Sequence, residues 1–213
     1  MKASHHPIFA RFYTRLSRAM ERTEIAGHRD ELLDDLAGLV LEVGAGNGMN
    51  FAHLPAGVTK LIAIEPEPYL RGQAVEAAAR APVAVAVLAG VAERLPLDDA
   101  SVDAGVVSLA LCSVLDQRAA LAELHRVIRP GGELRFYEHV RAETPAQARF
   151  QRGVDVVWPL LAGGCHTARD TPRAIEDAGF VPLQVRRFDL GPRFANPAAP
   201  HVLGRAGRPG MGP

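Results

Sequence analysis

The feature that most constrains the fold is a buried apolar run that ends in closely spaced glycines, in the stretch VLEVGAGNGMNF at residues 40–51. The run predicts a buried strand, and Gly44, Gly46 and Gly48 follow it at two-residue spacing. Flexible residues directly after a rigid segment cost backbone entropy, and this cost is explained if a ligand must approach the main chain closely. The spacing therefore predicts a binding loop in preference to a tight turn without a ligand.

Strand and helix patterns alternate along the rest of the chain. Buried strands are expected at residues 39–43, 61–65, 83–88, 102–111 and 133–140. Helices are expected at residues 28–36, 68–80, 115–128 and 171–178, with a helix-rich insert after about residue 144. This alternation predicts an α/β fold, a doubly wound and mainly parallel sheet with helices on both faces. Two closing strands, 180–190 and 201–206, lack a helix between them and predict an antiparallel hairpin at one edge of a seven-stranded sheet.

Composition excludes several classes of protein. Lys+Arg and Asp+Glu both total 24, and this balance argues against nucleic acid as a partner. The two cysteines, Cys112 and Cys165, lack metal-ligand spacing, so we expect a reducing compartment and no metal site. The N-terminal stretch has no signal-peptide pattern and no apolar run reaches 18 residues, which predicts a cytoplasmic protein. The sequence does not predict an oligomeric state.

Glu65 ends the second expected strand, 21 residues after Gly44. In such a sheet, ligands bind outside the carboxyl ends of the strands, where a carboxylate accepts hydrogen bonds from the ribose hydroxyls of adenosine. A nicotinamide-dependent oxidoreductase would use the same acid. However, the glycines follow G-x-G-x-G and not the G-x-G-x-x-G that seats a pyrophosphate, and Tyr13, Tyr69 and Tyr137 have no lysine four residues on. The loop favours a smaller cofactor.

Further motifs carry a family resemblance. Residues 90–114, GVAERLPLDDASVDAGVVSLALCSV, place an acid after the third strand and an L-P-L-D-D-A-S-V-D stretch before the fourth, and RVIRPGG follows at residues 126–132. With the glycine loop and Glu65, these motifs resemble class I S-adenosylmethionine-dependent methyltransferases over residues 35–140. The stretches RPGGELRFYEHV and DVVWPLLAGGCHTARDTPRAIEDAGF resemble the methyltransferase-like subfamily whose animal members act on small alkyl thiols, to about residue 206.

The resemblance implies a Rossmann-like methyltransferase fold, S-adenosylmethionine as cofactor and a set of cofactor-binding residues. The matching positions are Glu42, Gly44, Ala45, Gly46 and Gly48 at the methionine part, Glu65 and Pro66 at the ribose, Ala92 and Glu93 at the adenine, and Ser108 and Leu109 behind the transferred methyl group. Asn47 departs from the Thr or Ser that is common in relatives, but its amide can also bind the amino-acid end of the cofactor.

An amphipathic helix is expected from Pro7 to about Glu24. Its apolar stripe is Ile8, Phe9, Phe12, Leu16, Ala19 and Met20, and its basic stripe is Arg11, Arg15, Arg18 and Arg22. The helix could lie over the pocket as a lid, as extra N-terminal helices do in this fold family, or could contact an anionic membrane weakly. The lid is favoured. We therefore expect lid helices over residues 1–36, one methyltransferase domain over 37–206 and a disordered tail over 207–213.

The expected reaction is in-line methyl transfer to a small or lipophilic small-molecule acceptor. A thiol is favoured because its ordinary pKa of about 8.5 leaves a usable thiolate fraction near neutral pH. His139, at the end of the fifth strand, is the candidate base, and its neighbour Glu138 is expected to point to the opposite face. A phospholipid amine, a quinone precursor or a metabolite hydroxyl stays an alternative acceptor, as does a binding module without turnover.

The helical insert contains further candidates. Asp155, Trp158 and His166 are expected near the roof of the acceptor pocket, with a structural role equally open for each. Cys112 could relay the methyl group, but a buried structural cysteine is the favoured interpretation, for Cys165 as well.

Overall fold

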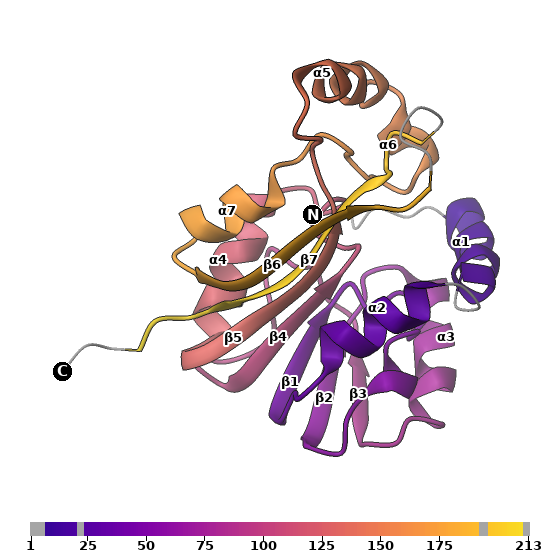
Figure 1. The fold of residues 1–213 in the computed structure, drawn as a ribbon. Helices are drawn as coiled ribbons and strands as arrows, with labels where there is room; N and C mark the ends of the chain where they lie inside the picture. Colours follow the sequence, from indigo (N-terminus) through magenta and orange to yellow (C-terminus); the bar gives the residue numbers. More distant parts are fainter. Residues whose placement is uncertain (1–6, 21–23, 192–195, 211–213) are drawn as a thin grey trace.

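The computed structural model describes residues 7–20, 24–191 and 196–210, and its centre is one seven-stranded sheet (Figure 1). The strands are β1 (Gly38–Val43), β2 (Val58–Ile64), β3 (Val85–Leu88), β4 (Val102–Ser108), β5 (Ile128–His139), β6 (Val181–Asp189) and β7 (Pro200–Gly207). Their order is β3-β2-β1-β4-β5-β7-β6. The first five strands pair in parallel, while β7 lies antiparallel between β5 and β6. The doubly wound, mainly parallel sheet and its antiparallel hairpin are thus confirmed.

Two apolar cores fill the space between the sheet and its helices. The helical elements are α1 (Pro7–Met20), α2 (Glu24–Leu33), η1 (Phe51–His53), α3 (Pro68–Ala78), α4 (Gln117–Val127), α5 (Pro145–Val154), α6 (Trp158–Leu161) and α7 (Thr171–Asp177). One core joins α2 and α3 to one face of the sheet, and the other joins α4 and α7 to the opposite face (Figure 1). Since both faces are covered, the central strands are mostly apolar, as their sequence predicts, with Glu42 on β1 and Glu138 on β5 as buried exceptions.

Local signals explain where the helices that flank the site begin. The side chain of Glu67 caps α3 by accepting a hydrogen bond from the N–H of Leu70 at 2.8 Å, and Pro68 takes the first helical position. Asp116 caps α4 in the same way, through the N–H of Ala119 at 3.0 Å. Both helices follow the carboxyl end of a strand, so these caps fix how the chain leaves the edge of the sheet where ligands bind.

The first helix packs through a face that its apolar stripe did not predict. Ala10, Thr14 and Ser17 are buried, whereas Phe12 is 60% and Leu16 is 42% exposed. Small side chains allow α1 to approach the body of the protein closely, which large ones on the same face would prevent. The helix ends at Met20, before the expected residue 24; residues 21–23 lie outside the described residues.

Two further expectations require correction. The fourth strand ends at Ser108 and not at residue 111, because Leu109 takes a positive φ of 55° and turns the chain out of the sheet. Of the tail expected to be disordered from residue 207, Gly207 belongs to β7, and the N–H of Arg208 donates to the carbonyl of Gly132 at 2.8 Å. Residues 211–213 lie outside the described part of the chain.

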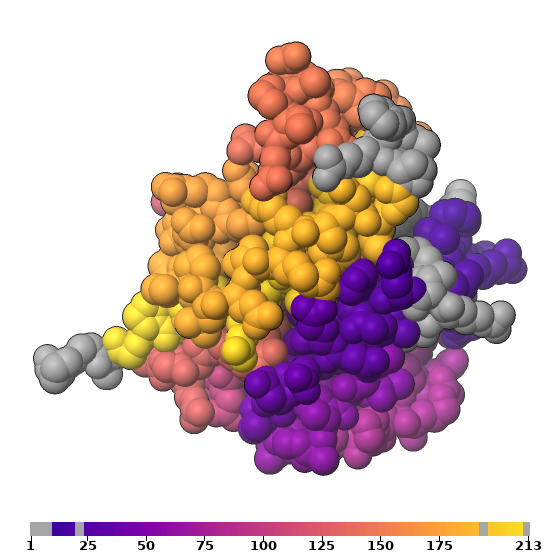
Figure 2. Space-filling model, viewed as in Figure 1, coloured from indigo at the N-terminus to yellow at the C-terminus, as the bar shows by residue number. Residues whose placement is uncertain are grey.

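Helices α5 and α6 form the insert between β5 and α7, and they project beyond the sheet (Figures 1 and 2). The insert follows the carboxyl end of β5, so it stands over the edge where the glycine loop lies. Its last helix exposes large apolar side chains: Leu160 is 77% and Leu161 is 71% exposed. Within the described residues, no helix is both long and apolar enough to cross a membrane.

The hairpin provides a test of this fold through two glycines on β7. Gly204 pairs with Phe136 and Val185, and a Cβ atom there would overlap the carbonyl oxygen of Gln184 and lie 2.9 Å from the Phe136 ring. At Gly207 the nearest atom, in Leu183, would lie 3.5 Å away. We expect Gly204→Ala to lower the free energy of unfolding by about 2 kcal/mol through overpacking, and Gly207→Ala to change it little. Urea unfolding of both variants measures this, and equal effects would contradict the pairing.

Candidate functional site

A cavity of about 560 Å³ lies at the carboxyl ends of the central strands. Its lining combines the glycine loop after β1, the end of β2, the segment after β3 and the loop after β4. Helices α1 and α2 and the α6 insert contribute to the other walls. The fold therefore places the cavity where parallel α/β sheets bind ligands, at the position that the glycine spacing predicted.

The three glycines of the loop have two different structural roles. All three have positive φ, at 74°, 57° and 76° for Gly44, Gly46 and Gly48. Gly44 and Gly46 line the cavity, and Gly44 lies so close to Ala110 that a Cβ atom would come within 2.5 Å of that methyl group. Gly48 instead packs against Phe51 and α3, where a Cβ atom would clash. Gly44 and Gly46 thus leave main chain open to a ligand, while Gly48 fits the loop onto the helix.

Glu65 ties the glycine loop to the end of β2. One carboxylate oxygen accepts the N–H of Gly46 and the other accepts the N–H of Glu67, both at 2.8 Å. A carboxylate has about four lone pairs, so both oxygens can still accept hydrogen bonds from ligand hydroxyls. Burial raises the pKa of Glu65 to about 7, although these two hydrogen bonds act to lower it. The side chain is 5% exposed and lines the cavity, as expected of a group that binds a nucleoside.

Two residues predicted at the cofactor lie behind the cavity wall. Glu42 is 2% exposed and accepts a hydrogen bond from the Asn50 amide at 2.7 Å, and burial raises its pKa to about 7. Ala45 donates its N–H to the carbonyl of Ile64 at 3.2 Å. Neither residue lines the cavity. Both hold the loop in place, which is a supporting role.

The residues predicted near the nucleoside do line the cavity. Pro66, Ala92 and Glu93 form adjoining parts of its wall. One oxygen of Glu93 accepts the backbone N–H groups of Leu115 and Asp116 at 2.9 and 3.2 Å. Glu93 therefore fixes the segment that precedes α4, and its second oxygen is the one that could meet a ligand.

The loop after β4 is held by a buried carboxylate on the neighbouring strand. Glu138 is fully buried and accepts the N–H groups of Ala110, Leu111 and Cys112 at 2.9, 2.9 and 3.1 Å. Burial raises its pKa to about 7, against the lowering by these three bonds. Ser108 and Leu109, predicted behind the methyl group, begin this loop and line the cavity.

The candidate base His139 lies beside both cysteines. Its Nδ1 is 3.3 Å from the sulfur of Cys165 and 3.7 Å from the sulfur of Cys112. All three residues line the cavity. A hydrogen bond from Cys112, together with His139, lowers the pKa of Cys165, while the same hydrogen bond and burial raise that of Cys112. Sequence spacing favoured a structural role for both cysteines, and the structure places both in the cavity wall beside an imidazole.

Of the three other candidate residues in the insert, one lines the cavity and two do not. Trp158 lines the cavity, and its side chain is one of the groups that lower the pKa of Cys165. Asp155 accepts the N–H groups of Thr167 and Ala168 at 2.7 and 3.1 Å, so it holds the insert together. His166 is not part of the cavity wall, and its Nδ1 lies 3.8 Å from Asp155.

The two N-terminal helices bring polar residues to the site that the sequence did not predict there. Tyr13, Ser17 and Arg29 line the cavity. The amide of Asn47 donates to the hydroxyl of Ser17 at 3.0 Å, which links α1 to the glycine loop. Tyr13 and Ser17 are four residues apart and so share one helix face, which could have indicated a polar face toward the site. The adjacent apolar stripe favoured a different buried face.

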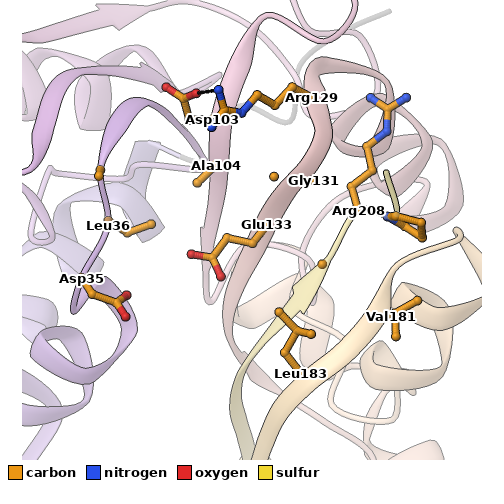
Figure 3. Close-up of a pocket in the computed structure, with 14 residues that line it drawn as sticks. Asp35, Leu36, Asp103, Ala104, Arg129, Gly131, Glu133, Val181, Leu183 and Arg208 are labelled. Carbon is orange, nitrogen blue, oxygen red and sulfur yellow. Dashed lines mark ion pairs between the residues drawn. The ribbon is translucent and has the colours of Figure 1, made fainter. Parts of the chain in front are cut away.

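A second cavity, of about 510 Å³, lies at the opposite edge of the sheet (Figure 3). Asp103 and Arg129 form an ion pair at 2.8 Å at one side of it, and Glu133 and Arg208 also line it. It adjoins the amino ends of β4 and β5, away from the edge where ligands bind in this type of sheet. We therefore place the functional site in the cavity at the glycine loop.

Comparisons with known proteins identify the family of this chain. Residues 41–136 match the family model described as "Methyltransferase domain". Thiol S-methyltransferase TMT1A of Homo sapiens is 35% identical over 171 residues, which cover 78% of this chain and 69% of that protein. Thiol S-methyltransferase TMT1B of Rattus norvegicus is 34% identical over the same shares of both chains.

A solved S-adenosylmethionine-dependent methyltransferase from Mesorhizobium loti has the same fold, with a TM-score of 0.66 and 18% identity over 89% of this chain and all of that one. These likenesses do not favour the nicotinamide alternative. The glycine loop, the buried acid after β2 and relatives that align over most of both chains lead to one conclusion: this chain belongs to the class I S-adenosylmethionine-dependent methyltransferases, and S-adenosylmethionine is its cofactor.

Proposed function

We propose that this methyltransferase transfers the methyl group to a small or lipophilic thiol. The observation that carries the proposal is the group of Cys112, His139 and Cys165, which shares a cavity with the glycine loop and Glu65. Relatives named thiol S-methyltransferases support the same acceptor class. An amine or a hydroxyl is the alternative, but a neutral alcohol or phenol would need a stronger base than a thiol does.

In this proposal the cofactor extends from Glu65 to the loop after β4. The ribose hydroxyls donate to Glu65, the adenine lies against Ala92 and Glu93, and the methionine part lies on the main chain at Gly44 and Gly46. Pro66 follows the ribose site, and Ser108 and Leu109 stand behind the methyl group. Glu42, Ala45 and Gly48 support the loop from behind.

Catalysis then depends mainly on alignment. The sulfonium makes the methyl group electrophilic, so the protein must hold the acceptor sulfur about 3–3.5 Å from it and in line with the leaving sulfur. His139 would accept the thiol proton as the base of this proposal. The bond between the methyl carbon and the acceptor sulfur forms as the bond to the sulfonium breaks. The electron pair of the broken bond stays on the sulfur of S-adenosylhomocysteine.

The rim of the cavity suits a lipophilic acceptor. Phe12, Leu16, Leu115 and Leu161 line the cavity and are each more than 40% exposed. Such an apolar rim would desolvate the hydrocarbon part of a ligand at its entry. We infer that α1, with Phe12 and Leu16, serves as a lid, and that weak membrane contact of the same rim is compatible with this role.

We propose a cytoplasmic location, because both cysteines are free thiols and reducing compartments maintain thiols in that state. The partner in this proposal is a small-molecule acceptor.

The first test is cofactor binding by calorimetric titration with S-adenosylhomocysteine. We expect Glu65→Ala to weaken binding by about 100-fold, because two hydrogen bonds to a charged group are lost. Glu76→Ala, an exposed glutamate on α3, is the matched control and should bind normally. NADH should not bind. Unchanged affinity in the Glu65 variant, or binding of NADH, would contradict the assignment.

The pH dependence of that affinity tests the state of Glu65. Its pKa of about 7 in the free protein leaves it mostly protonated at pH 6 and mostly ionised at pH 8. Ribose hydroxyls bind the ionised form better, so affinity should rise about tenfold between these pH values. The Gln side chain of Glu65→Gln cannot titrate, so the affinity of this variant should not rise with pH. Any effect of ligand titration on the affinity would appear in both proteins. An equal rise in both would exclude Glu65 as its source.

The acceptor is tested by incubating the protein with S-adenosylmethionine and a thiol, a phenol or an amine of matched size. We expect S-adenosylhomocysteine to form with the thiol at a rate at least tenfold above the others, since its thiolate is the strongest nucleophile available near pH 7.5. Glu65→Ala, assayed in parallel, should lose turnover at low cofactor concentration. Faster methylation of the amine or the phenol would overturn the thiol proposal and leave the cofactor site intact.

A further inference from the structure

The two cysteines and His139 are brought together from three separate segments of the chain. Cys112 belongs to the loop after β4, His139 is the last residue of β5, and Cys165 follows the α6 helix. Their ligand atoms, two sulfurs and one imidazole nitrogen, all lie within 4.8 Å of one another. No pair of the three stands at a metal-ligand spacing in the sequence, so only the fold reveals the cluster.

The two sulfur–nitrogen distances within the cluster are close to those of a metal site. A tetrahedral Zn²⁺ with Zn–S bonds of about 2.3 Å and Zn–N bonds of about 2.1 Å separates its sulfur and nitrogen ligands by roughly 3.6 Å. The two observed separations from Nδ1 of His139 are 3.3 Å to Cys165 and 3.7 Å to Cys112. An ion could therefore enter with small adjustments of side-chain torsions. Two thiolates and one imidazole make the ligand set of a catalytic zinc, which keeps its fourth position open.

The backbone around the cluster is fixed from several sides. The N–H of Cys112 donates to Glu138 at 3.1 Å, and its carbonyl accepts the N–H of His166 at 2.8 Å. Gly164, with φ of 90°, brings the next segment against Ser113, where a Cβ atom would lie 3.1 Å from the carbonyl oxygen. The scaffold thus presents both sulfurs to His139 before any ion binds, which is the preorganisation that metal sites require.

The charges at the cluster also fit a divalent ion. Cys112 and Cys165 are buried, with exposures of 1% and 6%. Two thiolates and Zn²⁺ form a neutral group, so the ion would compensate buried negative charge. Arg169 stands next to the cluster, with its guanidinium bound to the carbonyls of Leu111 and Val114 at 2.5 and 2.7 Å. Its positive charge could balance one further anionic ligand at the open position.

We propose that Cys112, His139 and Cys165 bind one Zn²⁺ ion whose fourth position faces the cavity and takes the acceptor thiol as a thiolate. This deepens the proposed methylation of a thiol and rests on it, and it replaces the role of base proposed there for His139. The thiol loses its proton to water when it binds the ion, so His139 acts as a ligand in place of a base. The thiolate attacks the methyl group, the sulfonium keeps the electron pair of the broken bond, and the neutral thioether leaves the ion.

The test is metal titration of the full chain after reduction and treatment with a chelator. Co²⁺ is the probe, because thiolate ligands give it charge-transfer absorption and Zn²⁺ should displace it. We expect one ion per chain and a change in the Co²⁺ spectrum when an alkyl thiol is added. Lack of thiolate bands in the unmodified protein, or a spectrum that the thiol does not alter, would overturn the proposal.

Variants assign the ligands. Cys112→Ser, Cys165→Ser and His139→Asn should each weaken Zn²⁺ binding by at least 100-fold. His166→Asn, next to the cluster in sequence but outside the cavity wall, is the matched control and should bind Zn²⁺ normally. Titration with S-adenosylhomocysteine reports whether each variant is folded. Zn²⁺ should also slow alkylation of both cysteines in the unmodified protein, and this measurement needs no variant.

The activity assay separates this proposal from the one on which it rests. We expect chelator-treated protein to methylate a thiol at least tenfold more slowly, with recovery on adding Zn²⁺. Full activity without metal would overturn the zinc site and leave thiol methylation standing. Methylation of an amine or phenol instead, with or without metal, would overturn the thiol acceptor itself.

Discussion

The site depends first on the carboxylate of Glu138, which accepts three backbone N–H groups from the loop after β4. Without such an acceptor these N–H groups would be buried and unpaired, at a cost of about 1–3 kcal/mol each. The bonds turn the loop out of the sheet, set Ala110 against Gly44 and place Cys112 beside His139. One buried side chain thus shapes both the cavity wall next to Gly44 and the wall next to His139.

The features of the fold that the sequence predicted are those determined by neighbouring residues in the chain. Apolar runs, cap residues and turn glycines act over a few residues, so the strands, most helices and the closing hairpin follow from them. The position of Glu65 beside the glycine loop was also predictable, because the glycine loop and the next strand end at one edge of a parallel sheet. Gly44 and Gly46 lie at the cavity for the same reason.

The parts that sequence did not predict depend on contacts between distant segments. The early end of β4 is set by Glu138, about 30 residues further on. Gly48 packs against α3, which no spacing rule shows. Helix α1 buries its small residues and leaves Phe12 and Leu16 partly exposed. The proximity of Cys112, His139 and Cys165 was not predicted, because the three residues come from two loops and the end of β5.

The most direct test of the central claim is a crystal structure of the protein with S-adenosylhomocysteine. The account predicts the ribose hydroxyls on Glu65, the homocysteine part along Gly44 and Gly46, and the sulfur atom directed toward Cys112, His139 and Cys165. A ligand whose sulfur points away from that cluster, or one bound at the opposite edge of the sheet, would contradict it.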